Sequence, residues 1–127
     1  QEWAASTLAA LGPGLMLWVA EAAGRIVGSV QLAPCLKPNG RHRGEVMKLL
    51  VQRSARGRGV ASALLARLEA DARAARLTLL VLDTEAGSPA EAIYRHLGWR
   101  YGGSIPRYAV TPDGAPHATV YMYRLLN

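Results

Sequence analysis

The chain has little cysteine, few histidines and no long apolar run. Its single cysteine, Cys35, excludes a disulfide framework within the chain and a cysteine-based zinc site. Its three histidines, His42, His96 and His117, lie far apart and show no metal-ligand spacing. No apolar run approaches the roughly 20 residues of a membrane-spanning helix, and the first residues lack the basic and apolar segments of a signal peptide. We therefore expect a cytoplasmic protein without a metal or a membrane partner.

The chain does have enough apolar residues for a core, and it has an excess of basic ones. Half of its 127 residues are hydrophobic, far too many for a disordered chain, and the length suits a single domain spanning residues 1–127. Fifteen basic residues against nine acidic ones give a formal net charge of +6. This balance favours a partner rich in phosphate or carboxylate, either a nucleic acid or a small phosphorylated cofactor.

Hydrophobic periodicity predicts an α/β order of elements. We expect helices over residues 1–11, 61–75 and 88–97, and strands over residues 15–21, 26–32, 45–51, 77–82, 99–110 and 118–126. The strand–helix–strand segment from 45 to 82 is a βαβ unit, so its two strands should lie parallel with a right-handed crossover. The hairpins on either side should be antiparallel. The predicted fold class is therefore α/β, with a mixed and mainly antiparallel sheet around a central parallel βαβ unit.

The most informative segment is Arg56–Ala61, which lies between a predicted strand and an amphipathic helix. Gly57 and Gly59 let the backbone turn sharply and approach a ligand closely. Free N–H groups at a helix N-terminus bind anions, and Arg56 and Arg58 add charge-assisted donors. The segment therefore predicts a pyrophosphate site. It has neither the Gly-Lys-Ser/Thr ending of a P-loop nor the Gly-x-Gly-x-x-Gly spacing of a dinucleotide fold.

The chain resembles the GNAT family of N-acetyltransferases in two motifs. Arg56–Ala61 matches Arg/Gln-x-x-Gly-x-Gly/Ala, the acyl-CoA pyrophosphate motif of that family. Ala92–Trp99 is similar to the family's Ala-x-Tyr-x-x-x-Gly-aromatic helix and turn. The resemblance runs from Leu15 to the C-terminus, so it implies a GNAT-like domain without the family's usual first strand and first helix. Further stretches resemble the tabtoxin-resistance type of acetyltransferase: residues 31–32, 35, 37–40, 45–46, 54–59, 82–88 and 111–114.

The resemblance implies transfer of an acetyl group from acetyl-CoA directly to an amine of a small molecule, which in this subtype is an amino-acid-like toxin or antibiotic. Backbone N–H groups at a strand end would hold the pantetheine and the thioester carbonyl: Leu49, Leu50 and Val51. The pyrophosphate would be held by Arg56, Gly57, Arg58, Gly59, Val60 and Ala61, with the Ser62 hydroxyl added. Ser88 stands where the family often has an asparagine, and its hydroxyl would substitute. A homodimer is expected by family analogy alone.

Three side chains are candidates for proton transfer. Tyr94 stands at the position of the family's general acid, and the alternative is a tyrosine that only packs. Asp83 ends a predicted parallel strand, and ligands of open parallel sheets lie outside the strand carboxyl ends. Glu45 begins the neighbouring strand and should approach the acceptor. Either carboxylate would accept the amine proton, directly or through water; the alternatives are a helix-capping aspartate and a solvated glutamate. Glu85 is a weaker third candidate.

Other residues are expected to pack rather than react. The apolar end of the strand over 45–51 predicts burial on both of its faces. Trp18 and Trp99 are predicted to lie in the core. For Tyr108 and Tyr121 we favour core packing over a place in the acceptor pocket.

Two other functions compete with acetyl transfer. A nucleic-acid-binding module suits the net charge, but the chain has no basic helix and no stripe of basic and aromatic residues. Five arginines instead fall around the predicted cofactor mouth, at positions 41, 43, 53, 56 and 58. A domain that binds CoA and senses rather than catalyses is consistent with a shortened N-terminal end. In the enzyme hypothesis, the carboxylates favour a cationic amine as acceptor.

Overall fold

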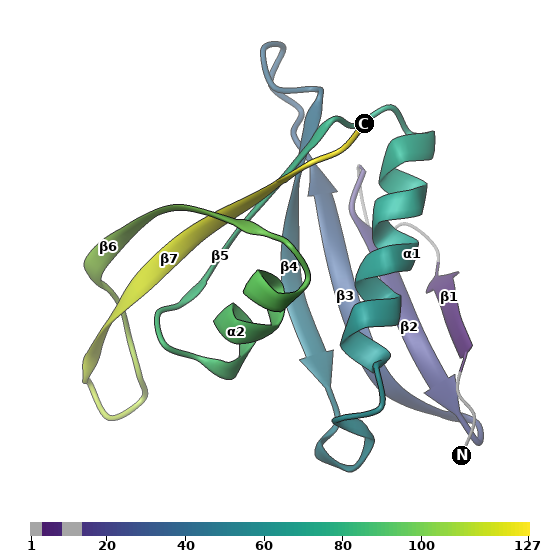
Figure 1. Cartoon of the computed structure of the whole chain (residues 1–127), viewed down its shortest axis with the longest axis horizontal. Coiled ribbons are helices and arrows are strands. Elements are labelled where there is room, and N and C mark those ends of the chain that lie inside the picture. Colours follow the sequence, from purple (N-terminus) through teal and green to yellow (C-terminus); the bar gives the residue numbers. More distant parts are fainter. Residues whose placement is uncertain (1–3, 9–13) are drawn as a thin grey trace.

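The computed structural model describes residues 4–8 and 14–127, which form one seven-stranded sheet and two α-helices (Figure 1). The helices are α1 (Val60–Ala74) and α2 (Pro89–His96), and a short 3₁₀ turn (Arg53–Ala55) precedes α1. The strands are β1 (Ala4–Leu8), β2 (Met16–Ala22), β3 (Arg25–Pro34), β4 (Arg43–Val51), β5 (Leu79–Glu85), β6 (Arg100–Val110) and β7 (Pro116–Leu125).

The sheet is mixed, with the order β1-β2-β3-β4-β5-β7-β6. β4 and β5 pair in parallel and are connected by α1, whereas every other neighbouring pair is antiparallel. The predicted α/β fold, with a central parallel βαβ unit between antiparallel hairpins, is therefore confirmed. The two strands of that unit are the ones that frame the candidate site.

The predicted helix over residues 1–11 is wrong where the structure describes it. Ala4–Leu8 forms strand β1, which pairs antiparallel with β2 from Ala4–Glu21 to Leu8–Leu17. Residues 1–3 and 9–11 of the predicted helix lie outside the described residues. The edge of β2 offers backbone N–H and C=O partners to these residues. A segment of five residues is too short for a stable helix, so the pairing with β2 outweighs the helix propensity of alanine and leucine. The sheet thus has a strand ahead of the β2–β3 hairpin that we did not expect.

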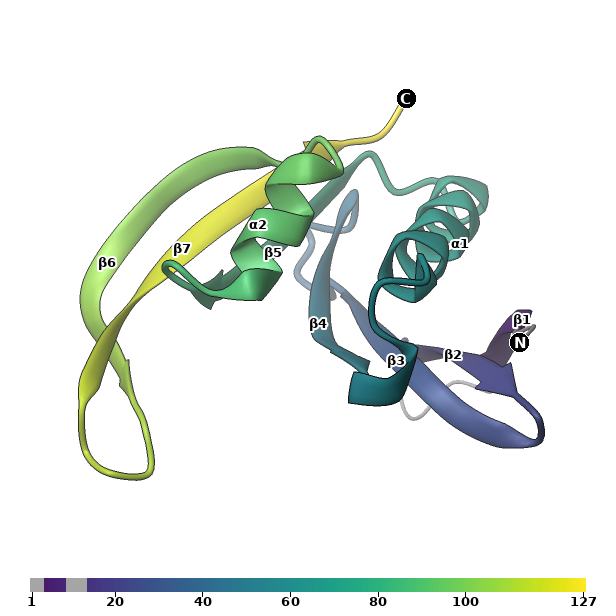
Figure 2. The same cartoon turned by 60° about the horizontal axis from the view of Figure 1, so that its bottom comes forward.

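Both helices pack on the same face of the sheet, and one hydrophobic core lies beneath them (Figure 2). The buried side chains of α1 recur every three or four residues, as the predicted apolar stripe requires. Trp18 on β2 is fully buried, and its Nε1 donates to Asp71 Oδ2 at 2.8 Å. Trp99 is buried between α2 and the sheet, so the predicted core positions of both tryptophans are confirmed. Among the described residues, no helix covers the opposite face of the sheet, which we call the open face.

A β-bulge in β4 decides which of its side chains reach the core. The pairing of β4 with β3 shifts register at this point, and Lys48 has a φ of 55°. The extra residue reverses the alternation of side chains, so Leu49 and Val51 pack against the core whereas Leu50 is 65% exposed. The prediction that this strand end is buried on both faces is therefore wrong for Leu50, because an apolar run does not reveal a bulge.

Candidate active site

Strands β4 and β5 pair over only three residue pairs, from Arg43–Leu79 to Glu45–Val81, and then diverge (Figure 2). Among the described strands, residues 46–51 continue to pair with β3, and residues 82–85 continue to pair with β7. We call the region between these two stretches the β4–β5 splay. Backbone groups that face the splay have no strand partner there, so they are free to bind an extended ligand. The predicted contact residues Leu49, Leu50 and Val51 lie on this part of β4.

The loop after β4 presents an uncapped helix N-terminus. Gly59, the N-cap of α1, has a left-handed φ of 78°, and α1 has no side-chain cap and no acidic residue in its first turn. Its first backbone N–H groups therefore keep the positive end of the helix dipole free for an anion. Gly57 has the same φ, and a Cβ at either glycine would meet open space. Arg56 and Arg58 are exposed beside this N-terminus, and the Arg56 side chain donates from Nε to the Val51 carbonyl at 3.3 Å.

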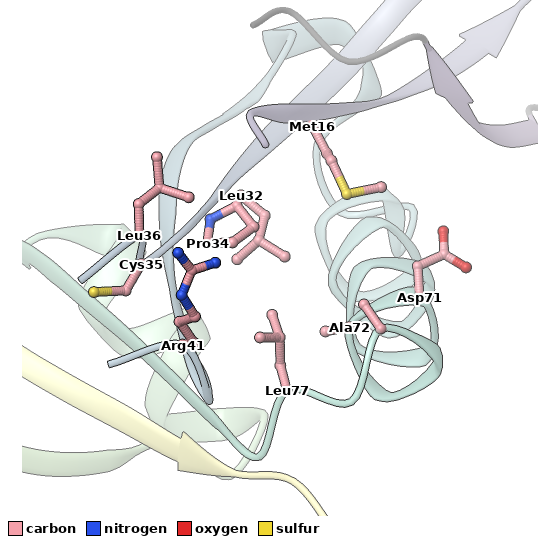
Figure 3. Close-up of a pocket in the computed structure, with 10 residues that line it drawn as sticks. Met16, Leu32, Pro34, Cys35, Leu36, Arg41, Asp71, Ala72 and Leu77 are labelled. Atoms are coloured by element: carbon pink, nitrogen blue, oxygen red, sulfur yellow. The ribbon is translucent and has the colours of Figure 1, made fainter. Parts of the chain in front are cut away.

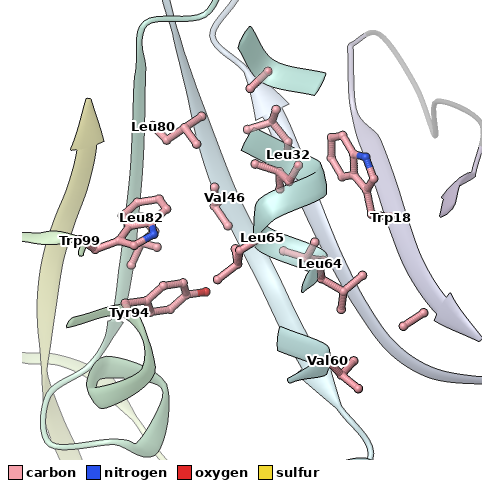
Figure 4. Packing of buried hydrophobic residues seen from close by; sticks show 14 of the residues in the cluster. Trp18, Leu32, Val46, Val60, Leu64, Leu65, Leu80, Leu82, Tyr94 and Trp99 are labelled. Atoms are coloured by element: carbon pink, nitrogen blue, oxygen red, sulfur yellow. The ribbon is translucent and has the colours of Figure 1, made fainter. Parts of the chain in front are cut away.

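Tyr94 on α2 lies on the helix-covered side of the splay. The side chain is 5% exposed and packs edge-on against Trp99, with ring centroids 5.4 Å apart. Burial raises the pKa of Tyr94 to about 12, so the phenol keeps its proton at neutral pH. Figure 4 shows its hydroxyl directed toward α1 and β4, away from the body of α2. The ring of Tyr94 packs in the core, as the predicted alternative states, while its hydroxyl is directed toward the splay.

The start of α2 is held by a reciprocal pair of side-chain contacts. The Ser88 hydroxyl accepts from the Glu91 backbone N–H at 3.2 Å and donates to the Glu85 carbonyl at 2.7 Å. Glu91 accepts from the Gly87 N–H at 2.8 Å in return. The helix N-cap predicted at Ser88, with Pro89 after it, is confirmed. The hydroxyl proton of Ser88 is donated to the Glu85 carbonyl, and its predicted contact with the cofactor stays a prediction.

Glu45 and Asp83 lie together on the open face. Glu45 pairs with Val81, and Asp83 follows two residues later on β5, so all three side chains point to the same side. This is the side opposite to the buried Leu82 and to Tyr94. The three predicted proton-transfer residues thus lie on opposite faces of the sheet at the splay. The two carboxylates are on the open face, and the phenol is on the helix-covered face.

Two tyrosines extend the open face beyond Asp83. Tyr121 on β7 stands directly opposite Asp83 in the β5–β7 register, and its hydroxyl donates to that of Tyr108 at 2.9 Å. This hydrogen bond raises the pKa of Tyr121 to about 12, and the nearby Asp83 and Glu45 carboxylates contribute to the shift. Tyr108 is 49% exposed and Tyr121 36%, so the core packing predicted for them is wrong. Both tyrosines lie on the β6–β7 hairpin, and no described segment covers the open face of that hairpin.

The predicted ring of five arginines around one mouth is also wrong. The arginines at positions 53, 56 and 58 follow the end of β4, whereas Arg41 and Arg43 lie at its start. A strand of this length separates the two groups by roughly 25 Å. Only the first group therefore lies close enough to contribute to an anion site at the start of α1.

Sequence reasoning missed two residues that position the site. Thr119 on β7 is buried, and its hydroxyl has Asp83 Oδ2 at 3.1 Å and the Thr84 carbonyl at 3.0 Å as acceptors. Arg124 donates to Glu69 on α1 at 2.8 Å and to the Leu97 carbonyl at 3.0 Å. Both contacts join residues far apart in the chain, and only the strand register brings them together.

Arg124 also explains the glycine of the second motif. Gly98 has a φ of 93°, and a Cβ added there would lie 2.8 Å from Arg124 Nη1. The turn after α2 therefore needs glycine both for its left-handed backbone and for the space that the guanidinium occupies. The glycine of the second motif is therefore explained by the structure of the turn after α2, next to the aromatic residue that follows it.

A small pocket of about 180 Å³ lies away from the splay (Figure 3). It is bounded by the β3–β4 connection and the C-terminal half of α1, with Arg41 and Asp71 among its lining residues. None of the predicted site residues lines it. Within residues 4–8 and 14–127 there is no cluster of three or more metal-binding side chains. In the same part of the chain, neither helix has the length and apolarity to cross a membrane.

Comparison with known proteins agrees with this architecture. The model of the acetyltransferase (GNAT) family matches residues 1–99. The IAA acetyltransferase of Azospirillum brasilense is 35% identical over 101 residues, which are 79% of this chain and 64% of that protein. The match therefore spans less than two thirds of this relative's length.

Several solved structures share the fold. The ribosomal-protein-alanine N-acetyltransferase of Brucella melitensis is 30% identical with a TM-score of 0.79, and the match covers 89% of this chain and 70% of that one. A GNAT-family acetyltransferase from Streptococcus pneumoniae has a TM-score of 0.82 at 23% identity, covering 89% and 68%. The Salmonella typhimurium protein yncA, solved with its cofactor acetyl-CoA, has a TM-score of 0.80 at 22% identity, covering 90% and 66%. On the family match and this fold, the chain belongs to the acetyltransferase (GNAT) family.

Proposed function

We propose that the protein transfers the acetyl group of acetyl-CoA directly to an amine of a small molecule. The observation that carries this proposal is the β4–β5 splay, with an anion-binding loop at its end and proton-transfer groups on its two faces. The reaction needs a held thioester, an acceptor for the amine proton and a donor to the departing thiolate. Each of these needs has a candidate group around the splay.

On the donor side, the start of α1 fits the pyrophosphate of acetyl-CoA. The uncapped N–H groups, the open space beside Gly57 and Gly59, and the two exposed arginines form a cradle for a doubly charged group. Backbone groups of residues 49–51 would hold the arm that carries the acetyl group. Acetyl-CoA would supply the activated thioester, and the loop and strand would hold it in place.

On the acceptor side, the open face suits a cationic amine. Glu45 and Asp83 attract an ammonium group, and either can take its proton directly or through water before attack. The Thr119 hydroxyl lies between Asp83 Oδ2 and the Thr84 carbonyl, so it can donate its one proton to Asp83 and orient that carboxylate. Because the phenol of Tyr94 lies on the other face, the proton leaves the amine on one side of the splay and the thiolate meets a donor on the other side.

Binding of acetyl-CoA is the direct test of the donor side. At about 100 times its dissociation constant, acetyl-CoA should raise the free energy of unfolding by about 2.7 kcal/mol, measured by urea or thermal unfolding. The Arg56→Gln, Arg58→Gln double variant should need more acetyl-CoA for the same effect. Arg25→Gln, an exposed arginine at the β2–β3 turn, is the matched control and should behave like the wild type. An unfolding free energy that does not respond to acetyl-CoA would contradict the proposal.

Tyr94→Phe tests the proton donor. Because burial holds the pKa of Tyr94 near 12, the phenol stays protonated below that pH and imposes no alkaline loss of activity in the usual assay range. The variant should therefore lower kcat by about 10²-fold at every pH, without changing the shape of the pH profile. Steady-state rates from about pH 6 to pH 10 check this. A basic limb present in the wild type and absent in the variant would show that Tyr94 titrates lower.

The acceptor within this class is the finer part of the proposal. The resemblance to the tabtoxin-resistance type supports an amino-acid-like toxin or antibiotic, while the A. brasilense relative is named an IAA acetyltransferase. The B. melitensis structure supports a second candidate, an N-terminal alanine amine of a protein. A panel of amino-acid-like amines, polyamines, aminoglycosides and alanine-starting peptides, assayed by release of free CoA, separates these acceptors.

A domain that binds CoA without catalysis is the alternative function. It predicts stabilisation by acetyl-CoA but no CoA release with any amine of the panel. Nucleic-acid binding finds less support, because the α1 arginines Arg67 and Arg73 are paired with Asp71 and Glu69. A gel shift with a steep dependence on salt would favour it.

A further inference from the structure

The indole nitrogen of Trp99 is a buried donor without an acceptor. The side chain is 4% exposed, and Nε1 has no hydrogen-bond partner among the described residues. Native proteins satisfy nearly all buried N–H groups, because an unpaired one loses the hydrogen bonds that it made to water. A buried N–H without a protein acceptor is therefore a candidate donor to a bound water or a ligand.

Trp99 lies in the part of the core beside Tyr94, which is the proposed proton donor of the splay. Its ring contacts that of Tyr94, and both side chains belong to the core cluster that includes Val46 on β4 and Leu82 on β5. Val46 and Leu82 are the first residues after the β4–β5 pairing ends. In Figure 4 the indole nitrogen and the Tyr94 hydroxyl both lie on the sides of their rings that face α1 and β4. The two donors are thus directed to the same side of the splay.

We propose that the Trp99 Nε1–H donates a hydrogen bond to a carbonyl oxygen of the acyl-pantetheine arm of acetyl-CoA; this inference rests on the proposed function. In the proposed function the arm would be held by backbone groups of β4, and its amide and thioester carbonyls would be available as hydrogen-bond acceptors. Trp99 is then a binding residue of the donor side, and the aromatic position of the second motif has a polar role in this chain as well as a packing one.

Trp18 provides a matched control within the same core. It is also fully buried, but its Nε1 already donates to Asp71 at 2.8 Å on the side of α1 remote from the splay. Trp18→Phe and Trp99→Phe remove the same atoms from the same core cluster. They differ in whether the lost N–H had a partner within the protein.

Two measurements on the full chain test the proposal. Trp99→Phe should raise the Kd for acetyl-CoA by about tenfold in calorimetric titration, whereas Trp18→Phe should leave the Kd unchanged and lower the unfolding free energy more. To remove only the N–H, the benzothiophene analogue of tryptophan placed at position 99 should weaken binding as Trp99→Phe does. In ¹⁵N–¹H spectra, the Trp99 indole proton should move downfield on titration with acetyl-CoA, while that of Trp18 stays in place.

The comparison of acetyl-CoA with CoA identifies the carbonyl. A downfield shift with both ligands assigns a pantetheine amide, and a shift with acetyl-CoA alone assigns the thioester; either result supports the proposal. Equal Kd values for wild type and both position-99 variants would overturn it, as would an indole resonance that ignores bound ligand. These failures differ from failure of the proposed function, in which acetyl-CoA does not bind the wild type at all.

Discussion

The double variant Glu45→Gln, Asp83→Asn should lower kcat/KM for the amine acceptor by about 10²- to 10⁴-fold near neutral pH. Both substitutions keep the size of the side chain and remove its negative charge. The variant therefore loses the proton acceptor and the attraction for a cationic amine together. The Kd for acetyl-CoA should stay close to that of the wild type, because the donor side is built from the loop at α1.

The structure also predicts how the two single variants compare. Asp83 has Thr119 as a hydrogen-bond donor, whereas no such partner fixes Glu45 among the described residues. A base held in one orientation contributes more than a mobile one, so Asp83→Asn should account for the larger share of the loss. Thr119→Val should reproduce part of the effect of Asp83→Asn, since it removes the hydroxyl and keeps the shape.

Glu21→Gln is the control for this experiment. Glu21 is an exposed carboxylate on β2, well away from the splay, so its loss changes the net charge without touching the site. Steady-state kinetics with one amine from the panel gives all the values. Turnover of the double variant equal to that of Glu21→Gln would show that neither carboxylate takes the proton.

The second large effect concerns stability. Arg124→Met should lower the free energy of unfolding by about 2–4 kcal/mol. Glu69 is 8% exposed and accepts from Arg124 Nε at 2.8 Å. In the part of the chain that the structure describes, the variant leaves this nearly buried carboxylate with only the more distant Arg73 as an ion-pair partner, at 3.9 Å. The variant also leaves the Leu97 carbonyl without the donor from Arg124. Urea unfolding at neutral pH measures the loss.

A double-mutant cycle separates the ion pair from the packing of the two side chains. Glu69→Met with Arg124→Met replaces both charges by apolar groups, so it should cost less than the sum of the single variants. Arg95→Met is the control, because the i,i+4 Arg95–Glu91 pair within α2 has the same 2.8 Å separation and a more exposed arginine, at 48% against 30%, and should contribute only about 0.5 kcal/mol. Equal losses for Arg124→Met and Arg95→Met would show that the Glu69–Arg124 contact is no stronger than an ion pair within one helix.

The elements that could be predicted from the sequence are those with local signals. The apolar stripe of α1, the Ser88-Pro89 start of α2 and the alternation along the hairpins all act over a few residues. The βαβ unit followed from element order, because a helix between two buried strands makes them parallel. The anion loop was recognisable for the same reason, since its glycines and arginines are adjacent in the chain.

The predictions that failed depended on long-range structure. The Ala4–Leu8 segment became a strand because β2 offers it an edge. Leu50 is exposed because of a bulge at Lys48, and nothing in the apolar run marks that position. Tyr108 looked like a core residue, but no described segment covers its side of the sheet. Such features depend on residues that are distant in the sequence and meet only in the folded sheet, so local sequence patterns do not reveal them.

The short pairing between β4 and β5 has a mechanical consequence. It divides the sheet into a half with β1 to β4 and a half with β5 to β7, joined through three residue pairs. Beyond this ladder the two halves are held together by side chains rather than by strand pairing, because one core cluster includes residues of both halves. The Glu69–Arg124 contact joins α1 of the first half to β7 of the second. Arg124 stands opposite Leu80, within the ladder itself, so this contact reinforces the closed end of the splay and leaves its open end to the packing of the core.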